Sequence, residues 1–453
     1  MSLRFKKSFF QLSSALQTLL VCGLSFSLVT LKRCFGKSNS NPLLRVVFVS
    51  ILVKLSLTLT ACGSGISAGI STIAQSSACT TTGSPYGGGG GTTASPYLIC
   101  SAAQLQNVGN NLSSNFALAA TIDLTNSSFT PIGSSSQPFS GTFDGANYNI
   151  SNWTYNNTST TTFVGLFSNV SGTVQNLNLV NAQITVSSSA QSTAILAGIL
   201  SAGALIQNCT VSGSVTTSSG AGYKMGGIAG SATGNSQANA TITNCSSSAN
   251  LIGAASGYLG GLVGSSSGHL TVTHSRATGF INCGTGSGFC GGLIGAVSND
   301  IQVSTSYYST GTISGSGSAV GGFFGTNGGG GVVTLSNCYS TGNVQGAFSS
   351  AGGISGNSYN TISFKNVFAA GLVSGGSSNG GLVAAIAGTL TATATYWDTS
   401  TTGQISSNAT GTISGTTSGY ATSAMQTTAT YSGWDFVNTW NPPVQGSSYP
   451  TLR

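Results

Sequence analysis

The carboxylates are the first residues to consider for catalysis, and the chain has few of them. Its 453 residues include five aspartates and no glutamate. Glycoside hydrolysis needs two carboxyl groups held a few ångströms apart, and lyase chemistry needs carboxylates that hold a cation beside a basic group. Asp123 and Asp144 would become neighbours if one turn of a repeat separated them. The alternative, which the sequence favours, is that Asp144 lies in an Asp-Gly turn and Asp123 ends a strand.

The two histidines, His269 and His274, are weak evidence for a metal or catalytic site. A separation of five residues places them on opposite faces of a simple strand, although a corner at His274 would change that. A His-Glu-x-x-His zinc-peptidase motif is impossible without glutamate. Serine and threonine are too numerous for one to stand out as a nucleophile. The sequence therefore predicts no catalytic residue, no metal ligand and no cofactor.

The ten cysteines have different predicted roles. Cys79 and Cys100 form a disulfide pair in the interpretation that suits an exported protein, and two free thiols are the alternative. Cys283 and Cys290 frame a glycine-rich segment, where a local disulfide is as plausible as free thiols. Three others share an inward position of the repeat described next, which favours small core residues over metal ligands: Cys209, Cys245 and Cys338.

A repeat supplies the elements that must position these residues. The motif Gly-Gly-apolar-apolar-Gly, clearest from Gly260 to Gly264, returns about every thirty residues, and a fixed period of that size is typical of a solenoid. Its glycines mark tight turns or close backbone approaches. The predicted turn positions are Gly165, Gly198, Gly227, Gly261, Gly292, Gly322, Gly353 and Gly381. We therefore predict an all-β fold, a parallel β-solenoid (β-helix) of about 8–10 coils with a short N-terminal capping helix. Its core would be a rod on the order of 40 Å long.

A recurrent asparagine marks a corner in each coil. Apolar residues normally recur two positions apart in a strand, but here they step by three across the asparagine before returning to two. Asparagine tolerates the left-handed conformation that such a bend needs, and stacked asparagines can hydrogen-bond from coil to coil. The predicted corner ladder comprises Asn176, Asn208, Asn244, Asn337 and Asn366.

The chain divides into five predicted segments: residues 1–61 as a targeting segment, 62–96 as a Ser/Thr/Gly-rich tether, 97–160 as an N-terminal cap and first coils, 161–390 as the repeats, and 391–453 as a C-terminal cap. Apolar residues at helical spacing between Ser101 and Leu112, with Ser101 as the cap, predict a short helix. The aromatic residues concentrated near the C-terminus are expected to close the second open end of the stack.

The basic charge belongs to the targeting segment. Eight of the twelve lysines and arginines precede Cys62, and the rest of the chain is close to neutral, which argues against a nucleic-acid partner. Small residues before Cys62, after a short apolar run, are typical of a lipoprotein signal peptide, with Cys62 as the lipidated residue. A transmembrane anchor and an ordinary secretory signal are the alternatives. Gly63 after the cysteine resembles lipoproteins sorted to the outer membrane.

The repeats from Tyr97 to Arg453 resemble the GLUG-motif family of bacterial surface proteins. The resemblance rests on the glycine motif, on Gly141-Thr142-Phe143-Asp144-Gly145, on the Asn-Cys-Tyr-Ser-Thr-Gly stretch at 337–342, and on the passages at Tyr396-Trp397-Asp398 and Gly433-Trp434-Asp435-Phe436. It implies parallel β-solenoids at cell surfaces or in secreted adhesin-like proteins, and similar repeats accompany some IgA-directed metallopeptidases. It implies no catalytic residue.

Two function classes follow. The first is a surface-tethered adhesin-like or structural binding module, held on the membrane by its lipid, whose hydroxyl-rich strands contact a glycan or another cell surface. The second is a carbohydrate-active β-helix enzyme, either a polysaccharide lyase or a hydrolase. Ice binding is a third idea, suggested by Thr241-Ile242-Thr243 and Thr271-Val272-Thr273, but too few coils repeat this pair for a regular array. Because paired carboxylates are scarce, we expect binding rather than catalysis.

Overall fold

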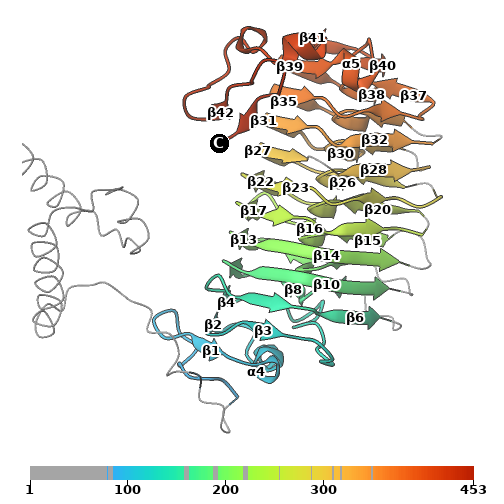
Figure 1. The fold of residues 1–453 in the computed structure, drawn as a ribbon. Coiled ribbons are helices and arrows are strands. Elements are labelled where there is room, and N and C mark those ends of the chain that lie inside the picture. The colour runs from blue at the N-terminus through green and yellow to red at the C-terminus, as the bar shows by residue number, and fades with distance from the viewer. Residues whose placement is uncertain are drawn as a thin grey trace, which may run out of the picture. The chain divides into compact units, whose positions relative to one another are not determined.

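The chain forms a stack of parallel β-strands in a computed structural model. The structure describes residues 79, 85–157, 163–186, 192–217, 223–254, 256–286, 288–308, 311–316, 319–347 and 350–453, which belong to the compact unit Ala74–Arg453. In Figure 1 the strands of successive coils lie one above another. The fold is nearly all β, a parallel β-solenoid of about eight turns with a short helix near its N-terminal end, which confirms the predicted fold class.

Each coil contributes strands to three sheets. In one coil, β20 (Gly257–Gly260) belongs to an eight-stranded sheet and β21 (Val263–Ser266) to a nine-stranded sheet, and the glycine motif joins them. The chain then enters a 24-stranded sheet at β22 (Leu270–Thr273), turns at the corner residue, and continues as β23 (Arg276–Ala277) and β24 (Ile281–Asn282). We call the strands before the corner the first row of this sheet and those after it the second row.

The other coils repeat this plan. The first row contains β1 (Tyr97–Ile99), β2 (Asn115–Leu118), β4 (Thr142–Asp144), β9 (Thr173–Gln175), β13 (Leu205–Gln207), β17 (Ala240–Thr243), β22, β27 (Ile301–Tyr308), β31 (Val333–Ser340), β35 (Ile362–Ala369), β39 (Leu390–Asp398) and β41 (Ile413–Tyr420), the last five of which run through the corner. The second row contains β3 (Ile122–Asp123), β5 (Asn149–Ser151), β6 (Thr154–Asn157), β10 (Asn178–Val186), β14 (Thr210–Thr217), β18 (Ser246–Ser247), β19 (Asn250–Ile252), β23, β24, β28 (Thr312–Gly315), β32 (Asn343–Gly346) and β36 (Val373–Ser374).

The two smaller sheets contain one short strand from each coil. The eight-stranded sheet contains β7 (Phe163–Val164), β11 (Ser192–Ala194), β15 (Tyr223–Gly226), β20, β25 (Phe289–Gly291), β29 (Ala319–Gly321), β33 (Ser350–Gly352) and β37 (Ser378–Gly380). The nine-stranded sheet contains β8 (Phe167–Val170), β12 (Ala197–Ser201), β16 (Ala229–Thr233), β21, β26 (Ile294–Val297), β30 (Phe324–Asn327), β34 (Ser355–Ser358), β38 (Val383–Ile386) and β40 (Asn408–Thr410).

A short helix precedes the first complete coil. Helix α4 (Ala102–Asn107) begins after Ser101, whose hydroxyl accepts a hydrogen bond from the Gln104 N–H, as an N-cap does. The 3₁₀ turn η1 (Val108–Asn110) continues it. Leu105 and Val108, four and seven residues after the cap, are fully buried against the core. Burial of this apolar stripe is what holds so short a helix in place.

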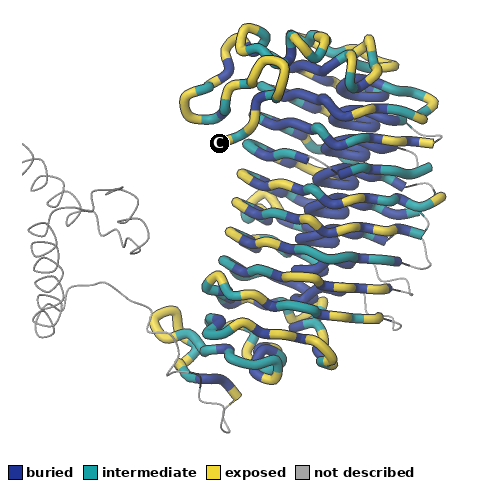
Figure 2. The backbone as a smooth tube through the Cα atoms, viewed as in Figure 1, coloured by how far each residue is buried: buried dark blue, intermediate teal, exposed yellow. Residues whose placement is uncertain are grey.

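One apolar core runs along the stack. Figure 2 shows buried residues alternating with more exposed ones along the strands of the 24-stranded sheet. In the first row the inward positions form in-register columns, such as Ile206, Ile242, Val272 and Val303. Because every coil buries its apolar side chains against the next, stability accumulates from coil to coil rather than from a single centre.

The motif glycines allow backbones to approach closely. A Cβ on Gly261 would lie 2.3 Å from the Gly292 carbonyl oxygen, and one on Gly292 would lie 2.2 Å from the Gly322 oxygen. None of the eight predicted turn glycines has a positive φ. Space, not a left-handed conformation, is therefore what requires glycine at these positions.

One predicted turn glycine belongs to a different column. The pairing of β12 with β16 places Gly198 opposite Gly230, the third glycine of the motif, and Ile195 takes the turn position in that coil. A Cβ on Gly230 would lie 2.4 Å from the Thr193 N of β11. The third glycine thus brings the eight-stranded and nine-stranded sheets into backbone contact. The assignment of Gly198 to the turn column was wrong because the alignment on glycine alone shifted that coil by three residues.

The C-terminal segment packs along the side of the stack. After β41 the chain forms α6 (Thr422–Met425), η2 (Thr428–Thr430) and the antiparallel pair β42 (Trp440–Asn441) and β43 (Thr451–Leu452). Its aromatic residues contact Tyr339, Phe368 and Tyr396, which come from three successive coils. Figure 1 shows this segment descending beside β35 and β31. The upper end carries β40, β41 and α5 (Thr399–Thr402), so the aromatic cluster lies on a side and not across the end as expected.

Candidate binding surface

Asp144 terminates two ladders of side-chain amides. Its Oδ1 accepts a hydrogen bond from Asn176 Nδ2 at 3.0 Å, and its Oδ2 accepts one from Gln175 Nε2 at 2.8 Å. The next coils continue both ladders, since Asn208 Nδ2 donates to Asn176 Oδ1 and Gln207 Nε2 donates to Gln175 Oε1. Every amide in these ladders donates toward the N-terminal end. A carboxylate accepts only, so it suits the last position.

Asp123 terminates a third ladder in another column. It accepts hydrogen bonds from the Thr125 N–H at 2.9 Å, the Thr125 hydroxyl at 2.7 Å and Asn152 Nδ2 at 3.0 Å. Asn181 Nδ2 then donates to Asn152 Oδ1 at 2.8 Å. The Thr125 hydroxyl, followed by the Asn152 amide and the Thr125 N–H, lowers the pKa of Asp123. A carboxyl group kept ionised in this way is a poor general acid.

The two carboxylates do not form a catalytic pair. Asp144 of β4 lies opposite Ala117 in register, whereas Asp123 of β3 lies opposite Ser151. They occupy different columns on opposite sides of a corner, and each is engaged with its own set of amides. The Ala146 N–H donates to Asp144 Oδ1 at 2.8 Å, as in an Asp turn.

The corner residues adopt one backbone conformation in coil after coil. The φ values of Asn176, Asn208, Asn244, Asn337 and Asn366 lie between 51° and 55°. Asn244 Nδ2 donates to Asn208 Oδ1 at 2.7 Å, and Asn366 Nδ2 donates to Asn337 Oδ1 at 3.0 Å. His274, Thr305 and Ala394 occupy the same corner with φ of 48–49° and interrupt the ladder. The coil therefore imposes the left-handed conformation even where the side chain does not favour it.

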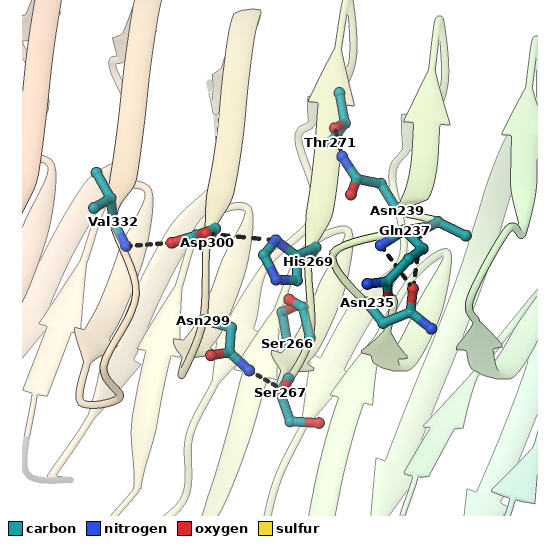
Figure 3. A network of polar contacts seen from close by, with 12 residues as sticks. Asn235, Gln237, Asn239, Ser266, Ser267, His269, Thr271, Asn299, Asp300 and Val332 are labelled. Atoms are coloured by element: carbon teal, nitrogen blue, oxygen red, sulfur yellow. Dashed lines mark hydrogen bonds and ion pairs between the residues drawn. The ribbon is translucent and has the colours of Figure 1, made fainter.

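His269 and Asp300 meet at the entrance to the first row. Figure 3 shows the imidazole pointing toward the carboxylate, with Nδ1 3.5 Å from Oδ2. The other carboxylate oxygen accepts the Val332 N–H at 2.7 Å. His269, Asp300 and Val332 each precede the first residue of a paired strand, so they form one column of successive loops. The role of Asp300 was not predictable from the corner motif, because Asp300 lies in the loop that precedes the first-row strand of its coil, where the repeats share no common residue.

The remaining carboxylates hold the C-terminal segment. Buried Asp398 accepts hydrogen bonds from the Ser400 and Thr401 N–H groups and from the Tyr449 hydroxyl at 2.8 Å. Asp435 accepts the Val437 and Asn438 N–H groups, which lowers its pKa. All five carboxylates of the sequence thus have structural hydrogen-bonding partners. In the described part of the chain, no group of three His, Cys, Asp or Glu residues could hold a metal ion.

The outer surface of the first row carries two columns of side chains that are polar at every position except Leu205. Residues two apart on each strand point outward, and strand pairing aligns them from β9 to β39. One column comprises Thr173, Leu205, Thr241, Thr271, Gln302, Thr334, Ser363 and Thr391. The other comprises Gln175, Gln207, Thr243, Thr273, Ser304, Ser336, Lys365 and Thr393. The hydroxyls bond to one another in places, as Thr273 Oγ1 does to Thr243 Oγ1 at 2.8 Å.

The cysteines in the part of the chain that the structure describes fall into bonded and free groups. Cys79 is disulfide-bonded to Cys100, and Cys283 to Cys290. The free thiols of Cys209, Cys245 and Cys338 are buried, and each donates to the carbonyl two residues earlier at 3.2 Å. Burial raises the pKa of Cys338 to about 12. A thiol kept protonated in this way is unreactive.

The predicted lipidation residue, Cys62, lies outside the described residues, so its assignment stays a prediction. None of the helices in the described part is long and apolar enough to cross a membrane.

Comparisons with known proteins add little. No family model and no curated protein matches the sequence. Among solved structures, one described as a candidate immunoglobulin A1 protease from Bacteroides ovatus matches with 20% identity and a TM-score of 0.45, over 82% of this chain and 95% of that one.

Proposed function

We propose that this chain is a surface-tethered β-solenoid lipoprotein that acts as an adhesin-like or structural binding module for a polymer such as a glycan. The observation that carries the proposal is the pair of polar columns on the first row, aligned over eight coils. Hydroxyl and amide groups repeated at the strand spacing of about 4.8 Å offer many weak hydrogen bonds to a chain-like ligand. Such contacts gain strength through multivalency.

The use of the carboxylates supports binding over catalysis. General acid and base chemistry needs two carboxyl groups that are free to exchange protons at one site. Here Asp123, Asp144, Asp398 and Asp435 accept two or more hydrogen bonds each, and Asp300 bonds a backbone N–H beside His269. Because the carboxylates are engaged in this way, the side chains of the polar columns are the groups that the surface offers to a ligand.

The binding proposal is tested with a glycan array and purified full-length protein, followed by product analysis for each polysaccharide that binds. We expect retention of at least one polysaccharide without any change in its length. Absence of binding to every glycan would contradict the proposal. Release of reducing or unsaturated sugar ends, lost in Asp123→Asn or Asp144→Asn, would instead support a carbohydrate-active enzyme.

The proposed tether is a lipid on Cys62 that anchors the chain to the outer membrane of a bacterial envelope, in keeping with the resemblance to GLUG-motif surface proteins. Small residues before Cys62 and a glycine-rich segment after it support this assignment. Cells fed a palmitate analogue should label the protein, and Cys62→Ala should abolish the label. A label that persists in this variant would contradict the anchor.

A further inference from the structure

Three of the four lysines and arginines in the described residues are unpaired, although the same residues contain five carboxylates. The ion pair present in this part of the chain joins His269 and Asp300. Lys224, Arg276 and Lys365 have neither an ion-pair partner nor a side-chain hydrogen bond among the described residues. Because each carboxylate is engaged in a ladder or a loop, the cations are available to a ligand with negative charge.

Arg276 stands beside the free end of an aromatic stack. Tyr307, Tyr339 and Phe368 come from three successive coils, with ring centroids 4.7 Å and 5.1 Å apart and interplanar angles of 6° and 8°. Arg276 of β23 is the register partner of Tyr307, one coil before it, and its side chain is exposed. One face of the Tyr307 ring therefore rests on Tyr339, and the other is turned toward the coil of Arg276.

The C-terminal segment sets the upper limit of the exposed part of this column. Tyr339 and Phe368 are buried beneath it, at 6% and 0% exposure, whereas Tyr307 is only partly buried. Below Arg276 the same column continues with Ser246, Thr210, Asn178 and Asn149, all at least partly exposed. We call the six positions from Asn149 to Tyr307 the polar track. It runs parallel to the stack axis and ends against the C-terminal segment.

We propose that the polar track binds a carboxylated polysaccharide, with Arg276 pairing with a sugar carboxylate and the free face of Tyr307 stacking on the sugar ring beside it. A guanidinium presents a fork of donors that matches a carboxylate, and an aromatic face packs against the apolar C–H face of a sugar. The amides and hydroxyls lower in the track bind the neutral parts of the polymer. Exposed His274, at the corner of the same coil, flanks the site.

Of the other unpaired cations, Lys224 of β15 is the register partner of Tyr258, whose ring stacks on Phe289 at a centroid distance of 5.7 Å, whereas Lys365 pairs with no aromatic residue in register. Lys365 lies among hydroxyls on the first row, where its register partners are Ser336 and Thr393. A lone ammonium attracts an anion without fixing its orientation. Arg276 and Tyr307 together define both the charge and the plane of a ligand, and so supply the selectivity that a uniform hydroxyl surface does not.

The inference rests on the proposed function, and the experiment separates the two. Full-length protein is titrated with alginate, polygalacturonate and hyaluronate, each beside its carboxyl-reduced form. We expect at least one acidic polymer to bind about tenfold or more tightly than its reduced form, since a charged hydrogen bond contributes about that much. Arg276→Gln should remove this preference, and the matched control Lys365→Gln should retain it. Tyr307→Thr, which places in the track a residue already present at Thr210, should weaken binding of both forms.

Each other outcome has a definite meaning. If acidic and reduced polymers bind equally, or if Arg276→Gln keeps the preference, this inference is wrong and the proposed function stands. If no polysaccharide binds in either form, both are contradicted. Binding of a DNA oligonucleotide without any polysaccharide would show that the cations serve another polymer. Thermal melts of each variant establish that the fold is intact.

Discussion

At the scale of residues, the solenoid uses its few charged and amide side chains to end and connect columns. Asp144 and Asp123 accept the last hydrogen bonds of amide ladders that run toward the N-terminal end. An amide in that last position would leave its own NH2 donor unpaired or, if flipped, would turn that donor toward the incoming NH2 donor. Carboxylates that looked like candidates for catalysis are thus explained by the direction of the ladders.

The ladder prediction concerns Asn208, which donates to Asn176 and accepts from Asn244. Asn208→Leu should lower the free energy of unfolding by about 2 kcal/mol, because it removes two hydrogen bonds and places an unfavourable side chain at a φ of 54°. Asn208→Gly tolerates the conformation and loses only the hydrogen bonds, so it should cost about 1 kcal/mol. Urea denaturation of the three proteins measures both. If the two variants lose the same free energy of unfolding, the left-handed conformation costs leucine nothing. If neither variant loses any, the hydrogen bonds of the ladder do not stabilise the fold.

At the scale of elements, the glycine motif is a packing device. The turn from the eight-stranded to the nine-stranded sheet lies against inward side chains that follow the corner, as Gly261 does against Ala277 and Gly292 against Tyr308. The turn column also stacks on itself through N–H to carbonyl bonds, such as Gly261 N to Gly292 O at 3.1 Å. A side chain at these positions would therefore collide with backbone that cannot move without shifting the next coil.

The packing prediction compares two glycines with opposite surroundings. Gly261→Ala places a Cβ 2.3 Å from the Gly292 oxygen and 2.6 Å from the Ala277 Cβ, so we expect a loss of about 3 kcal/mol or failure to fold. Gly328→Ala meets nothing within 4 Å and has no positive φ. That variant should be neutral or stabilised by up to about 1 kcal/mol. Soluble yield and denaturation midpoints distinguish the two, and similar midpoints would refute the close-approach explanation.

At the scale of the whole molecule, the C-terminal segment covers an aromatic stripe that the coils leave on their side. Tyr431, Trp434 and Trp440 pack over Phe368, and Trp440 reaches Tyr339 in the coil before. Tyr449 ties this segment to the last coils through its hydrogen bond to buried Asp398. Exposed, the stripe would be an apolar patch able to drive association.

The pH prediction concerns this tie. Burial, and to a smaller extent the Asp398 carboxylate, raises the pKa of Tyr449 from 10.0 to about 12. Because the folded state holds the phenolic proton more tightly than the unfolded chain, the stabilisation is complete below pH 10 and is lost as the pH rises toward 12. Other buried tyrosines also contribute to the loss of stability at high pH. The contribution of Tyr449 is therefore measured by comparing a Tyr449 variant with the wild type. Tyr449→Phe should be less stable than the wild type at pH 8 and should lose less further stability between pH 10 and 12.

Thermal melts from pH 8 to 12 provide the measurement. Tyr258→Phe is the control, since that hydroxyl has no hydrogen-bonding partner among the described residues. It should follow the wild-type curve. Parallel curves for the wild type and Tyr449→Phe would show that the hydrogen bond to Asp398 does not hold the C-terminal segment.

The sequence by itself determined the features that recur within one coil. The thirty-residue period, the alternation of inward side chains and the extra residue at each asparagine are local patterns, and they predicted a parallel solenoid with left-handed corners. The helix after Ser101 was predictable for the same reason, because its cap and apolar spacing lie within twelve residues. Only the tertiary structure decided the relations between coils. Loop lengths vary from coil to coil, so sequence alignment did not fix which residues become register partners. The shifted position of Gly198, the contact of His269 with Asp300, the placement of Arg276 beside Tyr307 and the C-terminal segment along the side all depend on that register.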